Sequence, residues 1–177
     1  MKPLVSLFVF CCIAVLLTNQ VTAKSPRTTN KHEATCSLHT DPTTTTPQPC
    51  MMSLYSLWHT FTFSKAPVVI IESTLCSPLS QPLDLQQPTV AIVSRGDCAF
   101  DAKTQHATEA GFAALIIVNS ESDPFLFGDP KSKQADGIPT LMVGNKFWDG
   151  DERLQACRSR QECPELFMDL FYGNFIL

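Results

Sequence analysis

The sequence lacks the residue patterns of the common enzyme active sites. It has no Gly-x-Ser-x-Gly turn for a nucleophilic serine, no His-Glu-x-x-His zinc pair and no glycine-rich phosphate loop. Its four histidines are scattered along the chain. We therefore expect a protein that is not an enzyme.

A long apolar segment of membrane-spanning length is also missing. Residues 4–17 form an apolar run, but a spanning helix needs about 20 such residues, and no later segment approaches that length. With Lys2 before the run and small residues ending at Ala23 after it, residues 1–23 have the pattern of an export signal cleaved before Lys24. The alternative is an uncleaved anchor. We expect a secreted protein, or one in the lumen of the secretory or vacuolar pathway, with no stable membrane span after cleavage.

The chain has no excess of basic residues. It contains 13 Lys and Arg against 17 Asp and Glu, and without Lys2 the balance of 12 to 17 gives a net charge of −5. Nucleic acid and anionic lipid attract basic surfaces, so neither is an expected partner. The 154 residues after the signal suffice for one domain with its own core.

Six cysteines remain once Cys11 and Cys12 leave with the signal. An even number in an exported chain indicates three disulfides, although sequence alone does not fix their pairing. Cys36 and His39 come nearest to metal-ligand spacing, but oxidation of Cys36 is favoured, so we expect no metal ion or cofactor. We favour pairing in sequence order: Cys36 with Cys50, Cys76 with Cys98, and Cys157 with Cys163.

Residues 24–50 are polar, rich in Thr and Pro, and show no apolar periodicity. This composition predicts a loop or tail, and we divide the mature chain into an N-terminal segment at 24–53 and a folded domain at 54–177. Threonine beside proline can carry O-linked sugar, and a bare extended linker is the alternative. Asn-x-Ser/Thr sequons are absent.

Apolar patterns beyond residue 54 predict an α/β domain. Residues 100–110 have helical spacing, with Gly111 placed to end the helix. The continuous apolar run at 112–118 indicates a strand covered on both faces, which is typical of a parallel sheet. A second helix is expected at 147–156, and 166–171 fits either a last strand or a helical turn. Further strands are predicted at residues 54–63, 67–71, 89–93 and 138–143.

One stretch resembles a known family. The motif residues Arg95, Gly96, Cys98 and Phe100 precede the predicted helix, and Asn119 ends the strand after it. This order resembles the signature of the protease-associated (PA) domain, over roughly residues 58–156. The segments at 76–79, 138–140 and 149–154 agree with it.

The resemblance implies an α/β fold, a twisted β-sandwich or open barrel of about seven strands with two flanking helices. It implies a disulfide between Cys76 and Cys98, because the motif cysteine often pairs with an earlier loop cysteine in this family. It also implies structural roles: Gly96 permits the tight turn and Phe100 anchors the helix. The structural motif comprises Arg95, Gly96, Phe100, Gly111 and Asn119.

Three further sequence patterns are candidate sites. The carboxylates of Asp149, Asp151 and Glu152 have no His or Lys nearby to divide acid and base roles, so a solvated helix start is favoured. Residues 95–97 spell the integrin-type tripeptide Arg-Gly-Asp, but the family turn already accounts for each residue.

The third pattern is an apolar triplet in an otherwise polar loop. If exposed together, Phe125, Leu126 and Phe127 would form a recognition patch, and a short core strand is the alternative.

PA domains accompany proteases, sorting receptors, glycosidase-like proteins and ubiquitin ligases, where they bind partners or cover an active site. The resemblance therefore implies a non-catalytic domain that binds a protein or peptide, through the loops at 76–88 and 119–137. One alternative is a truncated or accessory part of a PA-containing protease or glycosidase. Another is a cell-surface structural protein with a glycosylated Thr/Pro stalk.

Overall fold

The computed structural model describes residues 33–39, 46–56, 60–81, 83–129, 131, 137–149 and 166–172. The expected export signal, the Cys157–Cys163 pair, and Asp151 with Glu152 lie outside these residues. Within them, no helix has both the length and the apolar character to cross a membrane. The elements in chain order are β1 (Glu33–His39), β2 (Thr46–Met52), β3 (Phe61–Ile70), β4 (Val90–Ser94), α1 (Phe100–Glu109), β5 (Ala114–Val118), β6 (Thr140–Val143), α2 (Lys146–Asp149) and β7 (Phe167–Tyr172).

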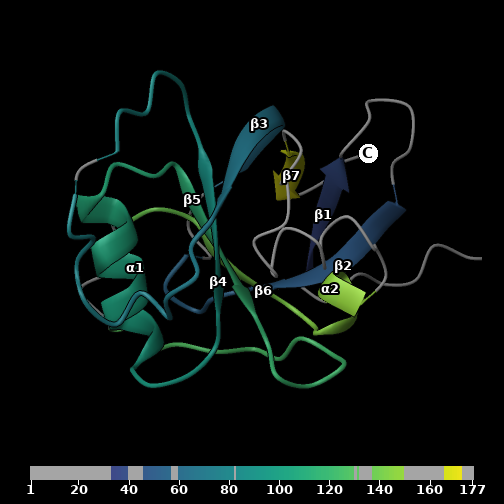
Figure 1. Cartoon of the computed structure of the whole chain (residues 1–177). Coiled ribbons are helices and arrows are strands. Elements are labelled where there is room, and N and C mark those ends of the chain that lie inside the picture. The colour runs from purple at the N-terminus through teal and green to yellow at the C-terminus, as the bar shows by residue number, and fades with distance from the viewer. Residues whose placement is uncertain are drawn as a thin grey trace, which may run out of the picture.

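The seven strands form a closed barrel in the order β1-β2-β6-β5-β4-β3-β7. In Figure 1, α1 lies on one side of β4, β5 and β6, while β1, β2 and β7 lie on the other. The α/β class and the number of strands agree with expectation, and the barrel is closed rather than open.

The unit formed by β4, α1 and β5 is the predicted crossover. β4 pairs in parallel with β3 and β5, and β5 pairs in parallel with β6. The helix ends at Glu109 with Ala110 as its C-cap, and Gly111 follows with φ +83°, a conformation that glycine adopts without strain. The prediction of a helix over 100–110 is therefore confirmed.

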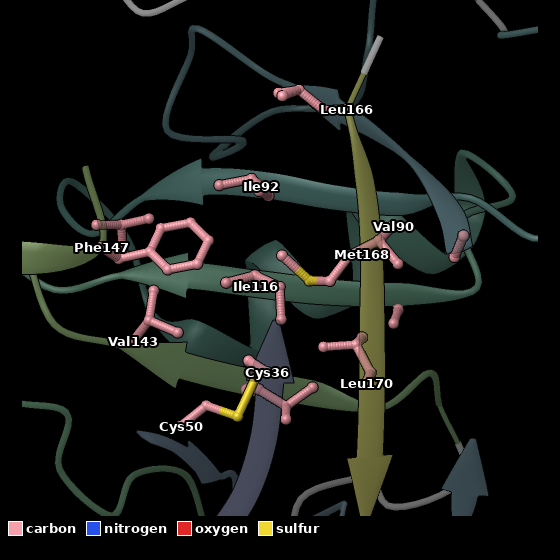
Figure 2. Close-up of a cluster of buried hydrophobic side chains, with 14 of the residues drawn as sticks. Cys36, Cys50, Val90, Ile92, Ile116, Val143, Phe147, Leu166, Met168 and Leu170 are labelled. Carbon is pink, nitrogen blue, oxygen red and sulfur yellow. A yellow bond between two sulfur atoms is a disulfide. The ribbon is translucent and has the colours of Figure 1, made fainter. Parts of the chain in front are cut away.

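Alternate residues of the parallel strands fill two separate cores, because successive side chains of a strand point to opposite faces. Ile92, Ile116 and Val143 belong to the barrel interior, together with Met168 and Leu170 from β7 (Figure 2). The residues between them face α1: Ala91, Val93, Leu115, Ile117 and Met142. The continuous apolar run is thus explained by a strand buried on both faces.

The expectation of a loop or tail before residue 50 is wrong for the part that the structure describes. β1 and β2 pair with each other antiparallel, β1 also pairs with β7, and β2 pairs with β6. Cys36 and Cys50 form a disulfide and are 0% and 1% exposed in the barrel interior. The pairing partners of these strands lie up to 136 residues away in sequence (Thr35 with Phe171), so local periodicity could not show them.

β7 resolves the open choice at residues 166–171 in favour of a strand. It pairs antiparallel with both β1 and β3 and thereby closes the barrel. Its inward residues Met168 and Leu170 are 0% and 1% exposed.

The expectation of two flanking helices is not supported. α1 is the one helix that covers a face of the barrel, and α2 is a four-residue turn in the described part of the chain. The reason lies in Phe147, whose side chain is buried among the interior residues of the barrel. A turn that inserts its aromatic residue into the end of the barrel does not lie along a face.

The contribution of β7 to the stability of the barrel can be tested by mutating a buried residue of this strand. We expect Leu170→Ala to lower the free energy of unfolding by about 3 kcal/mol, because it removes buried methyl groups and leaves a cavity. Urea denaturation monitored by circular dichroism measures this. Thr62→Ala, at an exposed position on the neighbouring β3, is the control and should cost less than about 1 kcal/mol. A Leu170→Ala loss as small as the control's would contradict the closed barrel.

Candidate functional site

The loops that follow β3, β4, β5 and β6 meet at one edge of the barrel. These strands are parallel, so their carboxyl ends lie together. We call this region the carboxyl edge, and it comprises residues 71–79, 95–99, 119–128 and 144–147. In open α/β sheets, ligands bind outside the carboxyl ends of the parallel strands.

Arg95 is held in place on the carboxyl edge. Its Nη1 donates a hydrogen bond of 2.8 Å to Oδ1 of Asn119. Its guanidinium carbon lies 4.9 Å from the ring centroid of Phe125 and 6.0 Å from that of Phe100, within the range of a cation–π contact. The residue is nevertheless exposed to solvent. A charged, exposed side chain is thus fixed by an amide and two rings.

Asn119 connects Arg95 to the next loop. It is 2% exposed, its Nδ2 donates to the carbonyl of Asp123 at 2.8 Å, and its Oδ1 also accepts from the backbone N–H of Ser120 at 2.9 Å. Both ends of the side-chain amide are therefore occupied by neighbours. The structural role implied for Asn119 is to hold the 119–123 loop and Arg95 in one arrangement.

Gly144 allows this loop to approach the end of β6. A Cβ built at Gly144 would collide with the carbonyl oxygen of Ser122. The backbone N–H of Asn145 donates to the carbonyl of Glu121 at 2.8 Å across the same contact. A small pocket of about 180 Å³ lies here, lined by Ser122, Asp123, Pro124, Val143, Gly144, Lys146 and Phe147.

The apolar triplet is divided between core and surface. Phe125 and Leu126 are 36% and 41% exposed, whereas Phe127 is 4% exposed. The ring of Phe127 packs 4.9 Å from that of Phe100, centroid to centroid. Neither the fully exposed patch nor a core strand is observed, because the segment has no strand pairing in the structure. Phe127 anchors the loop and its two neighbours face outward.

Tyr55 packs against the same loop through Phe127, and no pattern in the sequence indicated this role. Its hydroxyl hydrogen-bonds with that of Thr104 at 2.9 Å, and Thr104 with that of Thr140 at 3.1 Å. Its ring meets that of Phe127 edge-on at 6.3 Å. Burial of this side chain, opposed by the Thr104 hydrogen bond, raises the pKa of Tyr55 to about 12.

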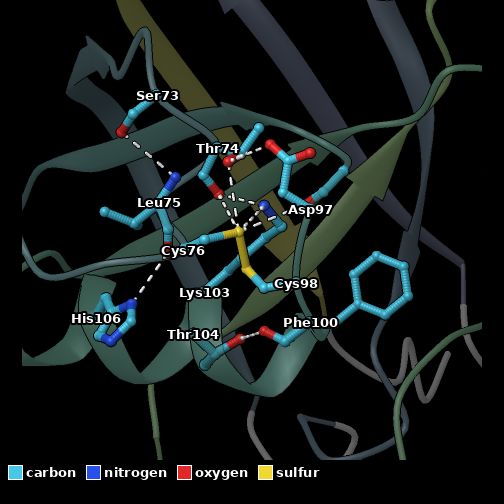
Figure 3. Close-up of a disulfide and its surroundings, with 11 residues drawn as sticks. Ser73, Thr74, Leu75, Cys76, Asp97, Cys98, Phe100, Lys103, Thr104 and His106 are labelled. Atoms are coloured by element: carbon cyan, nitrogen blue, oxygen red, sulfur yellow. Dashed lines mark hydrogen bonds between the residues drawn. A yellow bond between two sulfur atoms is a disulfide. The ribbon is translucent and has the colours of Figure 1, made fainter.

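The Cys76–Cys98 disulfide ties the segment after β3 to the turn after β4 (Figure 3). It closes a loop of 22 residues, which is worth about 3 kcal/mol on the chain-entropy estimate. Beside it, Thr74 Oγ1 donates to Oδ2 of Asp97 at 2.9 Å. Since Arg95 is bonded to Asn119 and Asp97 to Thr74, both charged residues of the Arg-Gly-Asp tripeptide are engaged by the fold.

Lys103 lies beneath this disulfide with no exposed surface. Its Nζ donates to the carbonyl oxygen of Thr74 and lies 3.6 Å from Sγ of Cys76 (Figure 3). Burial lowers the pKa of Lys103, and the nearby carboxylate of Asp97 raises it. No pattern in the sequence indicated this contact.

The two loops expected to bind a partner do not form one continuous surface. Residues 76–79 lie at the carboxyl edge, but residues 83–88 lead into the first residue of β4 and therefore lie toward its opposite end. Exposed Leu83 therefore lies toward the opposite end of β4 from Phe125 and Leu126. Across the described ranges, no three His, Cys, Asp or Glu side chains are grouped as metal ligands.

Comparisons with known proteins give a family and a fold. Residues 64–149 match the family model of the PA domain. The chain is 35% identical over 71 residues to vacuolar-sorting receptor 7 of Arabidopsis thaliana, a match that covers 36% of this chain and 11% of that protein. It is 32% identical over 74 residues to the E3 ubiquitin-protein ligase Godzilla of Drosophila melanogaster, covering 40% and 14%.

Similarity also extends to aminopeptidases. The chain is 28% identical over 105 residues to probable leucine aminopeptidase 2 of Aspergillus oryzae, covering 59% of this chain and 21% of that protein. The solved aminopeptidase from Aneurinibacillus sp. strain AM-1 superposes with a TM-score of 0.57 at 18% identity, covering 78% of this chain and 30% of that one. At that identity the likeness shows the fold alone. The matched regions are about a tenth to a fifth of these curated relatives.

The raised pKa of Tyr55 predicts a loss of stability at high pH. The folded state keeps the phenol proton to a higher pH than the unfolded chain, so the contribution is complete below pH 10 and is lost as pH rises through about 12. We expect the free energy of unfolding to fall by about 2 kcal/mol across this range from Tyr55 alone.

The measurement is urea denaturation at several pH values. Tyr55→Phe should remove this part of the decline, whereas the control Tyr172→Phe should retain it. An equal decline in wild type and Tyr55→Phe would refute the assignment.

Proposed function

We propose that this chain, a PA-domain protein as its sequence led us to expect, binds a protein or peptide at its carboxyl edge. In this proposal the domain performs no catalysis. The observation that carries this proposal is the fixed guanidinium of Arg95 beside exposed Phe125 and Leu126. A held charge next to accessible apolar surface suits recognition of a peptide with an acidic group near an apolar side chain.

The geometry of Arg95 supports binding of a carboxylate. One guanidinium nitrogen is bonded to Asn119, and within the described residues no other hydrogen-bond acceptor contacts the group. The remaining N–H groups can therefore donate to a ligand carboxylate, and arginine does so strongly through paired, charge-assisted hydrogen bonds. Phe125 lies against the same guanidinium and limits its movement.

Phe125 and Leu126 supply the apolar half of the proposed surface. They are exposed although most large apolar side chains of the described residues are buried, and exposed aromatic residues are typical of binding hot spots. Phe127 and Tyr55 pack against the buried side of the loop, so the loop has little conformational freedom left to lose on binding.

The compartment in this proposal is the lumen of the secretory or vacuolar pathway, or the outside of the cell. Two disulfides among the described residues support an oxidising environment. The export pattern at residues 1–23 and the similarity to a protein named as a vacuolar-sorting receptor agree with it.

A second candidate is an accessory domain of a hydrolase. The 105-residue similarity to a leucine aminopeptidase favours it, because that match extends over more of this chain than the receptor match does. Sequencing the transcript beyond the codon for Leu177 tests it. A reading frame that continues into a catalytic region would support this candidate, and a stop codon there would exclude it.

A peptide-display experiment tests the binding proposal. The mature protein is immobilised and used to select from a phage-displayed library of random heptapeptides. We expect enriched sequences to pair Asp, Glu or a free terminal carboxylate with an apolar residue. Arg95→Ala and Phe125→Ala should each weaken binding of these peptides by about tenfold or more, measured by fluorescence polarisation.

Matched variants separate this surface from the rest of the molecule. Leu83→Ala removes a comparably exposed apolar side chain at the other end of β4 and should leave the affinity unchanged. Arg95→Lys keeps the charge but loses the paired donors, so it should bind with intermediate affinity. The proposal fails if selection enriches no peptides, or if Leu83→Ala weakens binding as much as Phe125→Ala does.

A further inference from the structure

The two disulfides that the structure describes differ in their access to solvent. Cys36 and Cys50 are 0% and 1% exposed inside the barrel. Cys76 and Cys98 are each partly exposed at the carboxyl edge. Thiol–disulfide exchange requires an attacking thiolate to reach a sulfur atom, so only the second bond is open to attack in the folded protein.

The surroundings of the second disulfide are asymmetric. Nζ of Lys103 lies 3.6 Å from Sγ of Cys76 and can donate a hydrogen bond to it (Figure 3). The hydroxyl of Thr74 is 3.4 Å from the same sulfur but directs its hydrogen to Asp97, and the carbonyl oxygen of Gly96 lies at 3.5 Å. Among the described residues, no side-chain donor contacts Sγ of Cys98. Negative charge arising on Cys76 would therefore be stabilised by the ammonium of Lys103, whereas Cys98, before the first residue of α1, has no side-chain cation beside it in the described residues.

The cation beside Cys76 is part of the buried structure. Lys103 has no exposed surface, and α1 and the bond to the carbonyl of Thr74 keep its ammonium near the sulfur. The interaction of opposite charges is stronger in such a site than in water. Asp97 is the opposing charge on the neighbouring turn, and its carboxylate is bonded to the Thr74 hydroxyl.

We propose that the Cys76–Cys98 bond is a site of directional thiol–disulfide exchange, in which an incoming thiolate attacks Sγ of Cys98 and Cys76 leaves as a thiolate paired with Lys103. A bond forms between the incoming sulfur and Cys98, and the bond between Cys98 and Cys76 breaks with its electron pair going to Cys76. A monothiol leaves Cys98 modified as a mixed disulfide. This inference does not depend on the identity of any bound peptide.

A dithiol carries the exchange to completion. Its second thiolate attacks its own sulfur in the mixed disulfide, which releases Cys98 and leaves the reagent oxidised to a cyclic disulfide. Two electrons pass from the dithiol to the protein, giving two cysteine thiols. The expected class of co-reactant is a small thiol or a dithiol oxidoreductase of the secretory pathway.

The direct test uses the wild-type protein and reduced glutathione. The reaction is stopped with excess iodoacetamide, which alkylates the released thiolate, and peptides are mapped by mass spectrometry. We expect glutathione on Cys98 with alkylated Cys76 to exceed the reverse pattern by about tenfold. We also expect the Cys76–Cys98 bond to open at least about tenfold faster than Cys36–Cys50 in the same sample.

Variants of the lysine test the role of its charge. Lys103→Met should slow reduction of Cys76–Cys98 by dithiothreitol about tenfold, and Lys103→Arg should restore most of the rate. The control Lys146→Met removes an exposed charge elsewhere on the carboxyl edge and should leave the rate unchanged. The rate for Cys36–Cys50, measured in each variant, reports any opening by unfolding.

Three results would overturn the proposal. Equal glutathione on both cysteines, or an excess on Cys76, would refute the direction of attack without any variant being needed. Equal rates for the two disulfides in the wild type would refute selective access. A Lys103→Met protein that reacts as fast as wild type, while its Cys36–Cys50 bond stays intact, would refute the role of the ammonium.

Discussion

The double-sided burial of β5 is the constraint on which the rest of this structure depends. Ile116 packs into the barrel while Leu115 and Ile117 pack toward α1, so neither face of the strand can meet water. Such a strand requires covered neighbours, and β4 and β6 provide them in parallel. Because the strands run parallel, their carboxyl ends coincide. The fixed arginine, the half-exposed loop and the accessible disulfide are neighbours as a result of that direction.

The carboxyl edge combines a rigid base with an exposed rim. Asn119 joins two loops through its amide, and Tyr55 and Phe127 fill the space beneath. The exposed residues Arg95, Phe125 and Leu126 gain fixed positions from buried neighbours that have no direct access to a ligand. The Cys76–Cys98 bond is a second restraint on the same edge, and a change there would be transmitted to the turn that carries Arg95.

Local pattern predicted the parts of the fold in which neighbouring residues cooperate. The helix from Phe100, its end at Gly111 and the strand at 114–118 follow from spacing and composition. β1 and β2 did not, because they are stabilised by pairing with β7 and β6, which are distant from them in sequence. In the site, Arg95 and Asn119 were identified through the family motif. Lys103 and Tyr55 were missed because burial and hydrogen bonding depend on tertiary contacts.

Barrel closure also restricts how other chains can associate with this one. Each of the seven described strands has a neighbour on both sides, although β2 meets β6 only at Met51 and Met52 and β3 meets β4 only at residues 68–70. Many domains recruit extended peptides by adding a strand to an open sheet, and unprotected edges also seed fibrils. Where a strand is paired on both sides, the sheet offers neither route. At those strands the proposed peptide binding would depend on side chains and loop backbone, which favours selectivity for sequence over affinity for any extended chain.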